Sequence, residues 1–146
     1  HGPRGGDELN RIERGRNYGW PTITHGMNYD GTPIAERSEA PGMESPVVDW
    51  TPSIAVSQIE FYSGGTFSRW RNDLLVGSLA TQLFLRLRVQ DGRVVHREEI
   101  FRNHGRIRDI KTGPDGLIYL AIELVGKPGK IVRLVPAEGE RRTGAQ

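Results

Sequence analysis

The sequence has no cysteine, which excludes disulfides, thiolate metal sites and a cysteine nucleophile. The absence does not identify a cellular compartment, because a secreted protein with an adequate core needs no disulfide. The chain also lacks the run of about 20 apolar residues that forms a membrane-spanning helix. Its first residues do not show the basic, apolar and small-residue order of a signal peptide. We therefore expect a soluble chain without a membrane span.

Neither sign of charge is in large excess. The 20 Lys and Arg residues oppose 18 Asp and Glu residues, which gives a formal net charge of +2. The basic residues form no long run of the kind that grips a phosphate backbone, so nucleic acid is not an expected partner. The 146 residues, 36% hydrophobic and 26% charged, have the composition of one ordinary globular domain.

Turn-forming residues are abundant, with 19 glycines and 9 prolines spread along the chain. Between them lie short runs that are rich in β-branched and aromatic residues, and the alternation is clearest over 83–89, where leucines and Val89 share one side. This period of two, with turn signals at 90–93, 113–116 and 126–130, predicts an all-β, antiparallel sandwich, barrel or propeller without amphipathic helices. The predicted strands lie within 57–64, 73–79, 83–89, 92–101, 106–113, 116–123 and 129–136.

Two segments do not fit this strand pattern. Residues 26–48 form a long stretch rich in proline and glycine with little apolar alternation, so we expect a loop whose role is either functional or connective. Residues 137–146 lack apolar anchors, and we expect a flexible tail there.

Arg106 and Arg108 stand two residues apart on a predicted strand, just before the turn signal at 113–116. Residues with this spacing share one face of a strand, and two guanidinium groups can bind a carboxylate through paired N–H donors. The spacing alone leaves two interpretations open, an anion site or a solvated strand face.

Four motifs occur in an order that resembles the C-terminal part of the soluble quinoprotein sugar dehydrogenases, the glucose/sorbosone dehydrogenase family. They are HGPRGGDELN (1–10), GRNYGWP (15–21), WTPSIAVSQIEFY (50–62) and RIRDIKTGPDGLIYL (106–120). The resemblance implies a six-bladed β-propeller that binds pyrroloquinoline quinone (PQQ) and calcium and oxidises an aldose at C1 to the lactone.

The length of the chain bears on this expectation, because a four-stranded blade takes about 40–50 residues. The chain therefore holds about three blades, and the resemblance implies that 1–136 is the C-terminal half of the propeller. The family's catalytic histidine belongs to the N-terminal half. None of His1, His25, His96 and His104 lies in that histidine's motif, so no catalytic residue is assigned here.

The resemblance also implies site residues. Arg106 and Arg108 match a cofactor-binding element, while Tyr29 and Trp50 match positions that line the cofactor and substrate pocket, with Ser53 close by. Trp20 and Trp70 are expected in the core. One position departs from the family: many relatives have a lysine near the cofactor where this chain has Ala80, and losing that cation weakens binding unless another residue, such as Arg106, compensates.

The resemblance implies two calcium sites. The carbonyls of Gly2 and Pro3 match ligands of the calcium that also contacts the cofactor, and Asp7 could serve beside them as an outer-shell partner. Glu8 and the Tyr18 carbonyl match a further, structural calcium. From the residues alone, the same segment also reads as an exposed turn with solvated acids.

The function expected from the resemblance is the cofactor- and calcium-binding part of a PQQ-dependent aldose dehydrogenase. Its partners would be an aldose, an external electron acceptor, and either a second copy of the chain or a missing N-terminal half. Its location would be periplasmic or secreted. Two alternatives stay open: a non-catalytic binding or scaffold propeller, and an arginine site for phosphate or acidic sugars without quinone.

Overall fold

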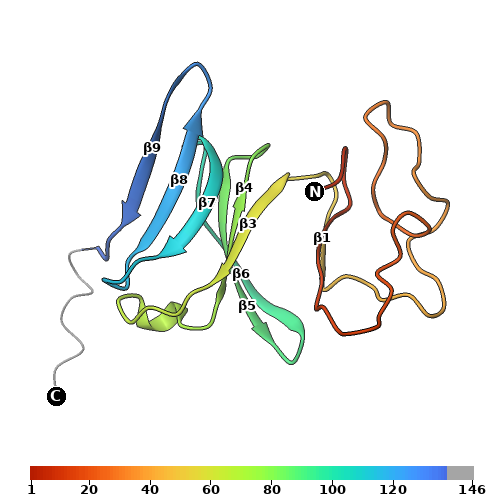
Figure 1. Cartoon of the computed structure of the whole chain (residues 1–146), viewed down its shortest axis with the longest axis horizontal. Helices are drawn as coiled ribbons and strands as arrows, with labels where there is room; N and C mark the ends of the chain where they lie inside the picture. Colours follow the sequence, from red (N-terminus) through yellow and green to blue (C-terminus); the bar gives the residue numbers. More distant parts are fainter. Residues whose placement is uncertain (138–146) are drawn as a thin grey trace.

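The computed structural model describes residues 1–137 and has three antiparallel sheets of two, four and three strands (Figure 1). This confirms the all-β prediction. Among the described residues, the helix is one short 3-10 turn, η1 (Ser68–Trp70), and no helix is long and apolar enough to cross a membrane. The strands are β1 (Asp7–Leu9), β2 (Val48–Trp50), β3 (Val56–Phe61), β4 (Leu74–Ser78), β5 (Leu83–Gln90), β6 (Arg93–Arg102), β7 (Arg106–Thr112), β8 (Ile118–Leu124) and β9 (Lys127–Leu134).

The four-stranded sheet β3-β4-β5-β6 is the middle layer (Figure 1). Its alternation places side chains in two separate cores, as a period of two requires. Leu85 and Leu87 of β5 face one apolar cluster, which Trp50 and Ile54 cover from the N-terminal side. Phe84 faces the opposite cluster. The sheet is therefore buried on both faces.

The three-stranded sheet β7-β8-β9 packs on the second of these clusters. Its Ile107, Ile110 and Leu120 are fully buried against Leu75 and Phe84 of the middle sheet. Because residues of one sheet cover the face of the next, the layers follow one another as the blades of a propeller do. The first of the three layers has only the two short strands β1 and β2.

The first strands of the two larger sheets run side by side in the same direction. The Ser57 hydroxyl of β3 donates to the Ile107 carbonyl of β7 at 2.5 Å. Further along, the Thr112 amide donates to the Glu60 carboxylate, and the Tyr62 hydroxyl donates to the Gly116 carbonyl at 2.6 Å. The starts of β3 and β7 therefore lie at the same end of the molecule.

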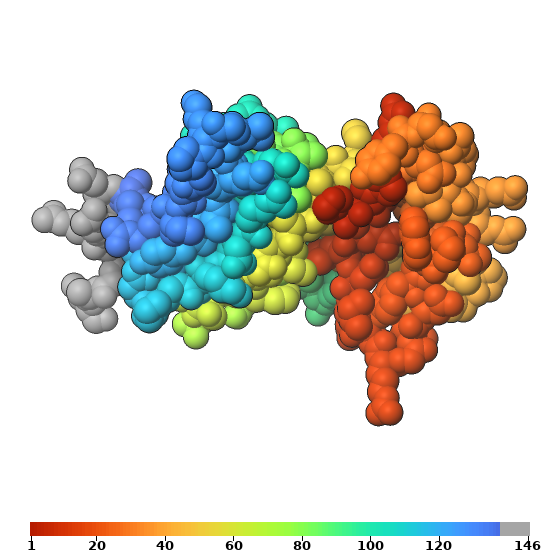
Figure 2. Space-filling model, turned by 45° about the horizontal axis from the view of Figure 1, so that its top comes forward, coloured from red at the N-terminus to blue at the C-terminus, as the bar shows by residue number. Residues whose placement is uncertain are grey.

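Residues 10–47, between β1 and β2, form an irregular segment that includes the loop predicted over 26–48, except for Val48, and begins earlier in the chain; it has one isolated bridge between Met27 and Pro33. In Figures 1 and 2 this segment forms a separate mass beside the sheets. Trp20 lies in this segment and is 63% exposed, so the prediction that it packs in the core is wrong. The buried apolar side chain nearby in the sequence is Ile23, which is 3% exposed. Trp70 does pack, stacked on Phe67 at 4.9 Å between ring centroids.

The predicted turn over 126–130 is shifted in the structure. The turn lies at Val125 and Gly126, and β9 already begins at Lys127. Pro128 is tolerated inside β9 because this is an edge strand, where a missing N–H donor costs no ladder bond. The expected flexible tail, apart from Ala137, lies outside the described residues.

Candidate functional site

Arg106 and Arg108 converge on one carboxylate, that of Glu123 on the neighbouring strand β8. Arg108 contacts the same Glu123 oxygen, Oε2, through Nε at 2.7 Å and through Nη2 at 2.5 Å. Arg106 Nε lies 3.8 Å from that oxygen. Ile107, between the two arginines, is fully buried. The pair thus leaves the core and presents guanidinium groups on one face, as the spacing predicts.

The three charged side chains remain accessible to solvent. Arg106, Arg108 and Glu123 are 37%, 48% and 38% exposed, respectively. An ion pair at this exposure contributes only about 0–1 kcal/mol to stability. The guanidinium groups can therefore be reached by a dissolved anion.

The N-terminal turn is held by a buried acid. Asp7 is 1% exposed, and its two carboxylate oxygens accept hydrogen bonds from the Gly2 amide at 2.8 Å and the Val56 amide at 3.1 Å. Gly2 must be glycine, because a Cβ there would lie 2.0 Å from the Gly5 carbonyl oxygen. Asp7 thus fixes the predicted ligand Gly2 against the start of β3.

The start of β3 connects this turn to the arginine pair. Val56 is bonded to Asp7, and the next residue, Ser57, is bonded to Ile107 between the two arginines. Gly2, Pro3, Arg106 and Arg108 therefore come from segments that meet at one end of the molecule, although they are about 100 residues apart in sequence.

Glu8 lies on β1 directly opposite Asp49 of β2. Like charges that face each other across two strands repel and destabilise the pair. Asn10 donates from Nδ2 to Glu8 at 3.0 Å, while its Oδ1 is buried without a hydrogen-bond partner among the described residues. Two carboxylates and an unpartnered amide oxygen are the donor chemistry that a hard cation such as calcium prefers.

The region contains no cluster of three or more His, Asp or Glu side chains that could hold a metal, over the residues that the structure describes. A calcium ion here would therefore depend on backbone carbonyls as well. Tyr18, whose carbonyl is a predicted ligand, has its hydroxyl fixed by the Arg11 carbonyl at 2.7 Å and by the Glu13 amide at 2.6 Å. This holds the loop that carries the Tyr18 carbonyl.

The aromatic residues predicted for the pocket lie in different surroundings. Tyr29 is 81% exposed on the long segment, whereas Trp50 is 4% exposed within an apolar cluster and its Nε1 has no partner among residues 1–137. Ser53 accepts the Ala55 amide at 3.0 Å in the turn before β3. Ala80 is exposed and brings no charge. The structure does not gather these residues around one cavity.

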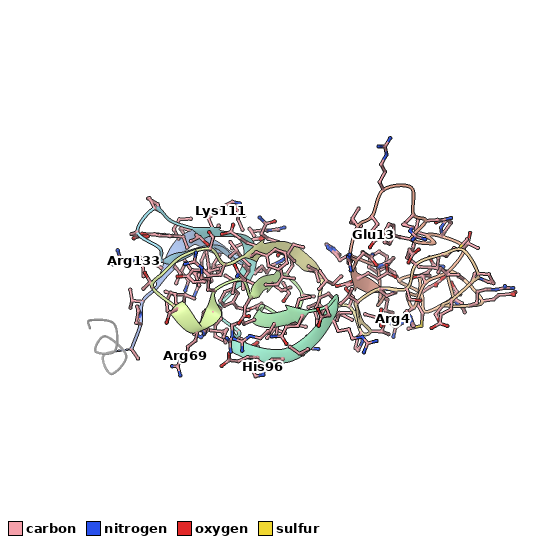
Figure 3. All side chains as sticks on the ribbon, turned by 90° about the horizontal axis from the view of Figure 1, so that it is seen from below. Arg4, Glu13, Arg69, His96, Lys111 and Arg133 are labelled. Carbon is pink, nitrogen blue, oxygen red and sulfur yellow. The ribbon has the colours of Figure 1, made fainter. Side chains whose placement is uncertain are left out.

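All four histidines, His25 included, are exposed. His1 Nδ1 lies 3.2 Å from the Val56 carbonyl at the exposed N-terminus. His96 is exposed on the edge strand β6, far from β3 in the sheet order (Figure 3). His104 is exposed and its ring meets Phe101 edge-on.

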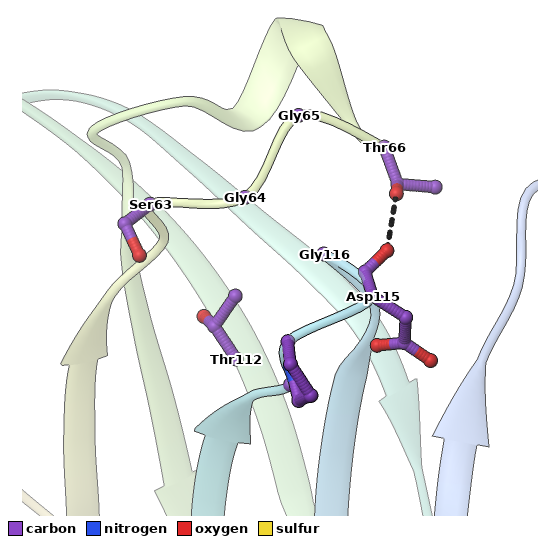
Figure 4. A pocket seen from close by; sticks show the side chains of 9 residues that line it. Ser63, Gly64, Gly65, Thr66, Thr112, Asp115 and Gly116 are labelled. Carbon is purple, nitrogen blue, oxygen red and sulfur yellow. Dashed lines mark hydrogen bonds between the residues drawn. The ribbon is translucent and has the colours of Figure 1, made fainter.

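A hollow lies at the opposite end of β3 and β7 (Figure 4). It has a volume of about 670 Å³ and is formed by two glycine-rich turns, 63–66 and 112–116. The Tyr119 hydroxyl and the Leu117 amide donate to Asp115 and lower the pKa of that carboxyl below its ordinary value. None of the predicted site residues lines this hollow. This depression between two turns is separate from the arginine pair.

Residues 1–133 match the family model described as Glucose / Sorbosone dehydrogenase. The chain is 39% identical over 139 residues to the aldose sugar dehydrogenase YliI of Escherichia coli strain K12, covering 93% of this chain and 37% of that protein. It therefore spans well under half the length of this curated relative.

Solved structures agree with this match. A crystal structure of a glucose dehydrogenase superimposes with a TM-score of 0.85 at 41% identity, covering 94% of this chain and 40% of that one. The soluble aldose sugar dehydrogenase of Escherichia coli, in its apo form, gives a TM-score of 0.78 at 37% identity, with 91% and 39% covered. A PQQ-bound aldose sugar dehydrogenase of Streptomyces coelicolor gives 0.64 at 22% identity, with 90% and 37% covered, which supports the fold alone.

Proposed function

The chain belongs to the glucose/sorbosone dehydrogenase family, and from this membership we propose that it supplies the cofactor-holding part of a PQQ-dependent aldose sugar dehydrogenase. The observation that carries the proposal is the convergence of Arg106 and Arg108 at the end of the molecule where Asp7 fixes Gly2. Bound there, PQQ would supply a two-electron acceptor for the hydride that leaves C1 of an aldose, giving the lactone. The electrons would then pass to an external acceptor.

In this proposal the arginines bind carboxylates of the quinone. Guanidinium groups match carboxylates bidentately, and both groups are open to solvent. Tyr29 and Trp50 are proposed to line the cofactor pocket. The proton of the sugar hydroxyl would be taken by a residue from the remainder of the propeller, since His1, His25, His96 and His104 are not assigned as bases.

We assign calcium to the same region. The carbonyls of Gly2 and Pro3 would ligate an ion that also contacts the quinone, and Asp7 would keep Gly2 in position through its amide. A second, structural ion would be bound by Glu8 and the Tyr18 carbonyl, with support from the unpartnered Asn10 Oδ1 and the facing Asp49. Family membership further leads us to propose a periplasmic or secreted location.

The proposal is tested by titrating the complete protein, this chain together with the remainder of the propeller, with PQQ and following the quinone absorbance, once with calcium and once with a chelator. We expect saturable binding with calcium and little or none with chelator. Equal affinity under both conditions would remove the calcium-bridged site. No binding under either condition would contradict the cofactor role.

A second candidate, a propeller that keeps the architecture without redox chemistry, is favoured by one observation. Ala80 replaces a lysine that many relatives place near the cofactor, and it is exposed without charge. Under this alternative, Ala80→Lys would raise the affinity for PQQ from a negligible level, whereas under the main proposal it would strengthen an existing interaction by about 1.5–3 kcal/mol.

A further inference from the structure

Glu123 already fills the position at which an anion would meet the arginine pair. Arg108 directs Nε and Nη2 at its carboxylate, at 2.7 and 2.5 Å. These two donors form the edge of the guanidinium group that binds carboxylates side-on. A ligand carboxylate cannot use the same edge while Glu123 holds it.

The ion pairs between Glu123 and the two arginines are weak enough to break. All three side chains are more than a third exposed, and such pairs are held weakly. Arg106, although directly opposite Glu123 in the strand register, reaches it only at 3.8 Å. The apolar packing of β8 comes from Ile122 and Leu120 on the other face. Glu123 can therefore release the arginines without disturbing the core.

We infer that Glu123 is a resident carboxylate that occupies the arginine site in the free chain and is displaced when a carboxylate of the quinone binds. This inference rests on the proposed function and adds a built-in competitor to it. The competitor keeps the two cations neutralised between binding events and lowers the apparent affinity for the ligand. If Glu123 instead oriented the arginines for the ligand, removing its charge would weaken PQQ binding.

The decisive variant is Glu123→Gln, which keeps the shape of the side chain and removes its charge. With calcium present, we expect PQQ to bind about two- to five-fold more tightly than to the parent, the range that corresponds to an exposed ion pair. The gain should shrink at high salt, because exposed pairs are screened. Unchanged or weaker binding would overturn the inference.

Three controls separate this result from others. Glu99→Gln removes an equally exposed carboxylate, paired with Arg102 at 2.7 Å on β6, and should leave the affinity unchanged. In Arg108→Ala, the further change Glu123→Gln should give a smaller gain, since only Arg106, 3.8 Å away, remains to be released from Glu123. Thermal unfolding of each variant reports folding, and Glu123→Thr, which suits a strand, serves if Gln unfolds the chain.

The two proposals fail in different ways. If the complete parent protein does not bind PQQ at all, the proposed function fails and the inference fails with it. If the parent binds and Arg106→Ala or Arg108→Ala weakens binding, but Glu123→Gln does not strengthen it, only the competitor role is wrong.

Discussion

Ser57 donates its hydroxyl proton to the carbonyl of Ile107 at 2.5 Å. The hydroxyl also lies 3.1 Å from the Gly77 carbonyl, but it has one proton to donate, and the shorter contact favours Ile107. Through this bond, the first strand of the middle sheet fixes the backbone between Arg106 and Arg108. The Asp7 bond to the neighbouring Val56 extends the connection to the N-terminal turn.

The first prediction concerns the arginine pair. Arg106→Ala and Arg108→Ala should each weaken PQQ binding by about 1.5–3 kcal/mol, because each removes a charge-assisted hydrogen bond. Absorbance titration with calcium present measures the loss. Arg102→Ala, which removes an exposed arginine paired with Glu99, is the matched control. Equal affinity in all four proteins would show that the pair is a solvated strand face.

The second prediction concerns the buried acid of the N-terminal turn. Asp7→Asn leaves one acceptor oxygen for two amide donors, those of Gly2 and Val56. We expect a loss of about 1.5–3 kcal/mol in the free energy of unfolding, measured with urea, together with weaker PQQ binding. The exposed Glu36→Gln is the control for charge. A stable variant that binds normally would mean that Gly2 needs no such support.

Much of the fold could be predicted from the sequence because the strands alternate cleanly between punctuating turns. The seven predicted strand segments correspond to β3 through β9. Trp20 was misplaced because burial of a tryptophan depends on the tertiary partners of its loop. The start of β9 was misplaced because Pro128 suggests a turn, whereas an edge strand accepts it.

The candidate site was predictable only in part, since spacing identifies a shared face but not what faces it. The i, i+2 spacing predicts that Arg106 and Arg108 share one face of their strand. It does not predict Glu123 beside them, because the position of Glu123 opposite Arg106 depends on the strand register. Register is set by turns and cross-strand packing. The same limit applies to Arg86, which lies on the side of 83–89 opposite the leucines: alternation does not show that it is only 8% exposed beside Asp73.

The third prediction follows from that buried pair. Asp73 is 2% exposed and accepts from Arg86 Nη1 at 2.7 Å and Arg88 Nε at 2.9 Å. Asp73→Ala should cost about 1.5–3 kcal/mol of stability, because Arg86 and Arg88 lose the buried carboxylate that they share and Arg86 keeps only Glu98, 2.6 Å from its Nη2. Chemical denaturation measures this. Glu36→Ala on the exposed long segment should cost far less, and similar losses in both would contradict the role of the pair.

The fourth prediction concerns calcium at Glu8. If an ion neutralises the facing carboxylates of Glu8 and Asp49, calcium should raise the melting temperature of the parent and Glu8→Gln should abolish that rise. In chelator, the same substitution should be neutral or stabilising, because it removes a like-charge repulsion. Differential scanning calorimetry in both conditions gives the four values. Glu39→Gln on the long segment is the control. A calcium-induced rise of equal size in Glu8→Gln would exclude Glu8 as a ligand.

The last prediction concerns assembly. Ile59 and Phe61 of β3 are 44% and 59% exposed beside the apolar residues Val76 and Leu74, and Ile131 of the terminal sheet is 73% exposed. A series of three layers that does not close on itself leaves such faces open, and open apolar faces favour association. We therefore expect the isolated chain to associate, either with a second copy or with an added N-terminal half, to complete the ring.

Light scattering measures the mass of the assembly. Phe61→Thr should shift the equilibrium toward monomer, whereas Val95→Thr, on the exposed edge strand β6, should not. A monodisperse monomer of the parent with cooperative unfolding would show that the three layers are self-sufficient.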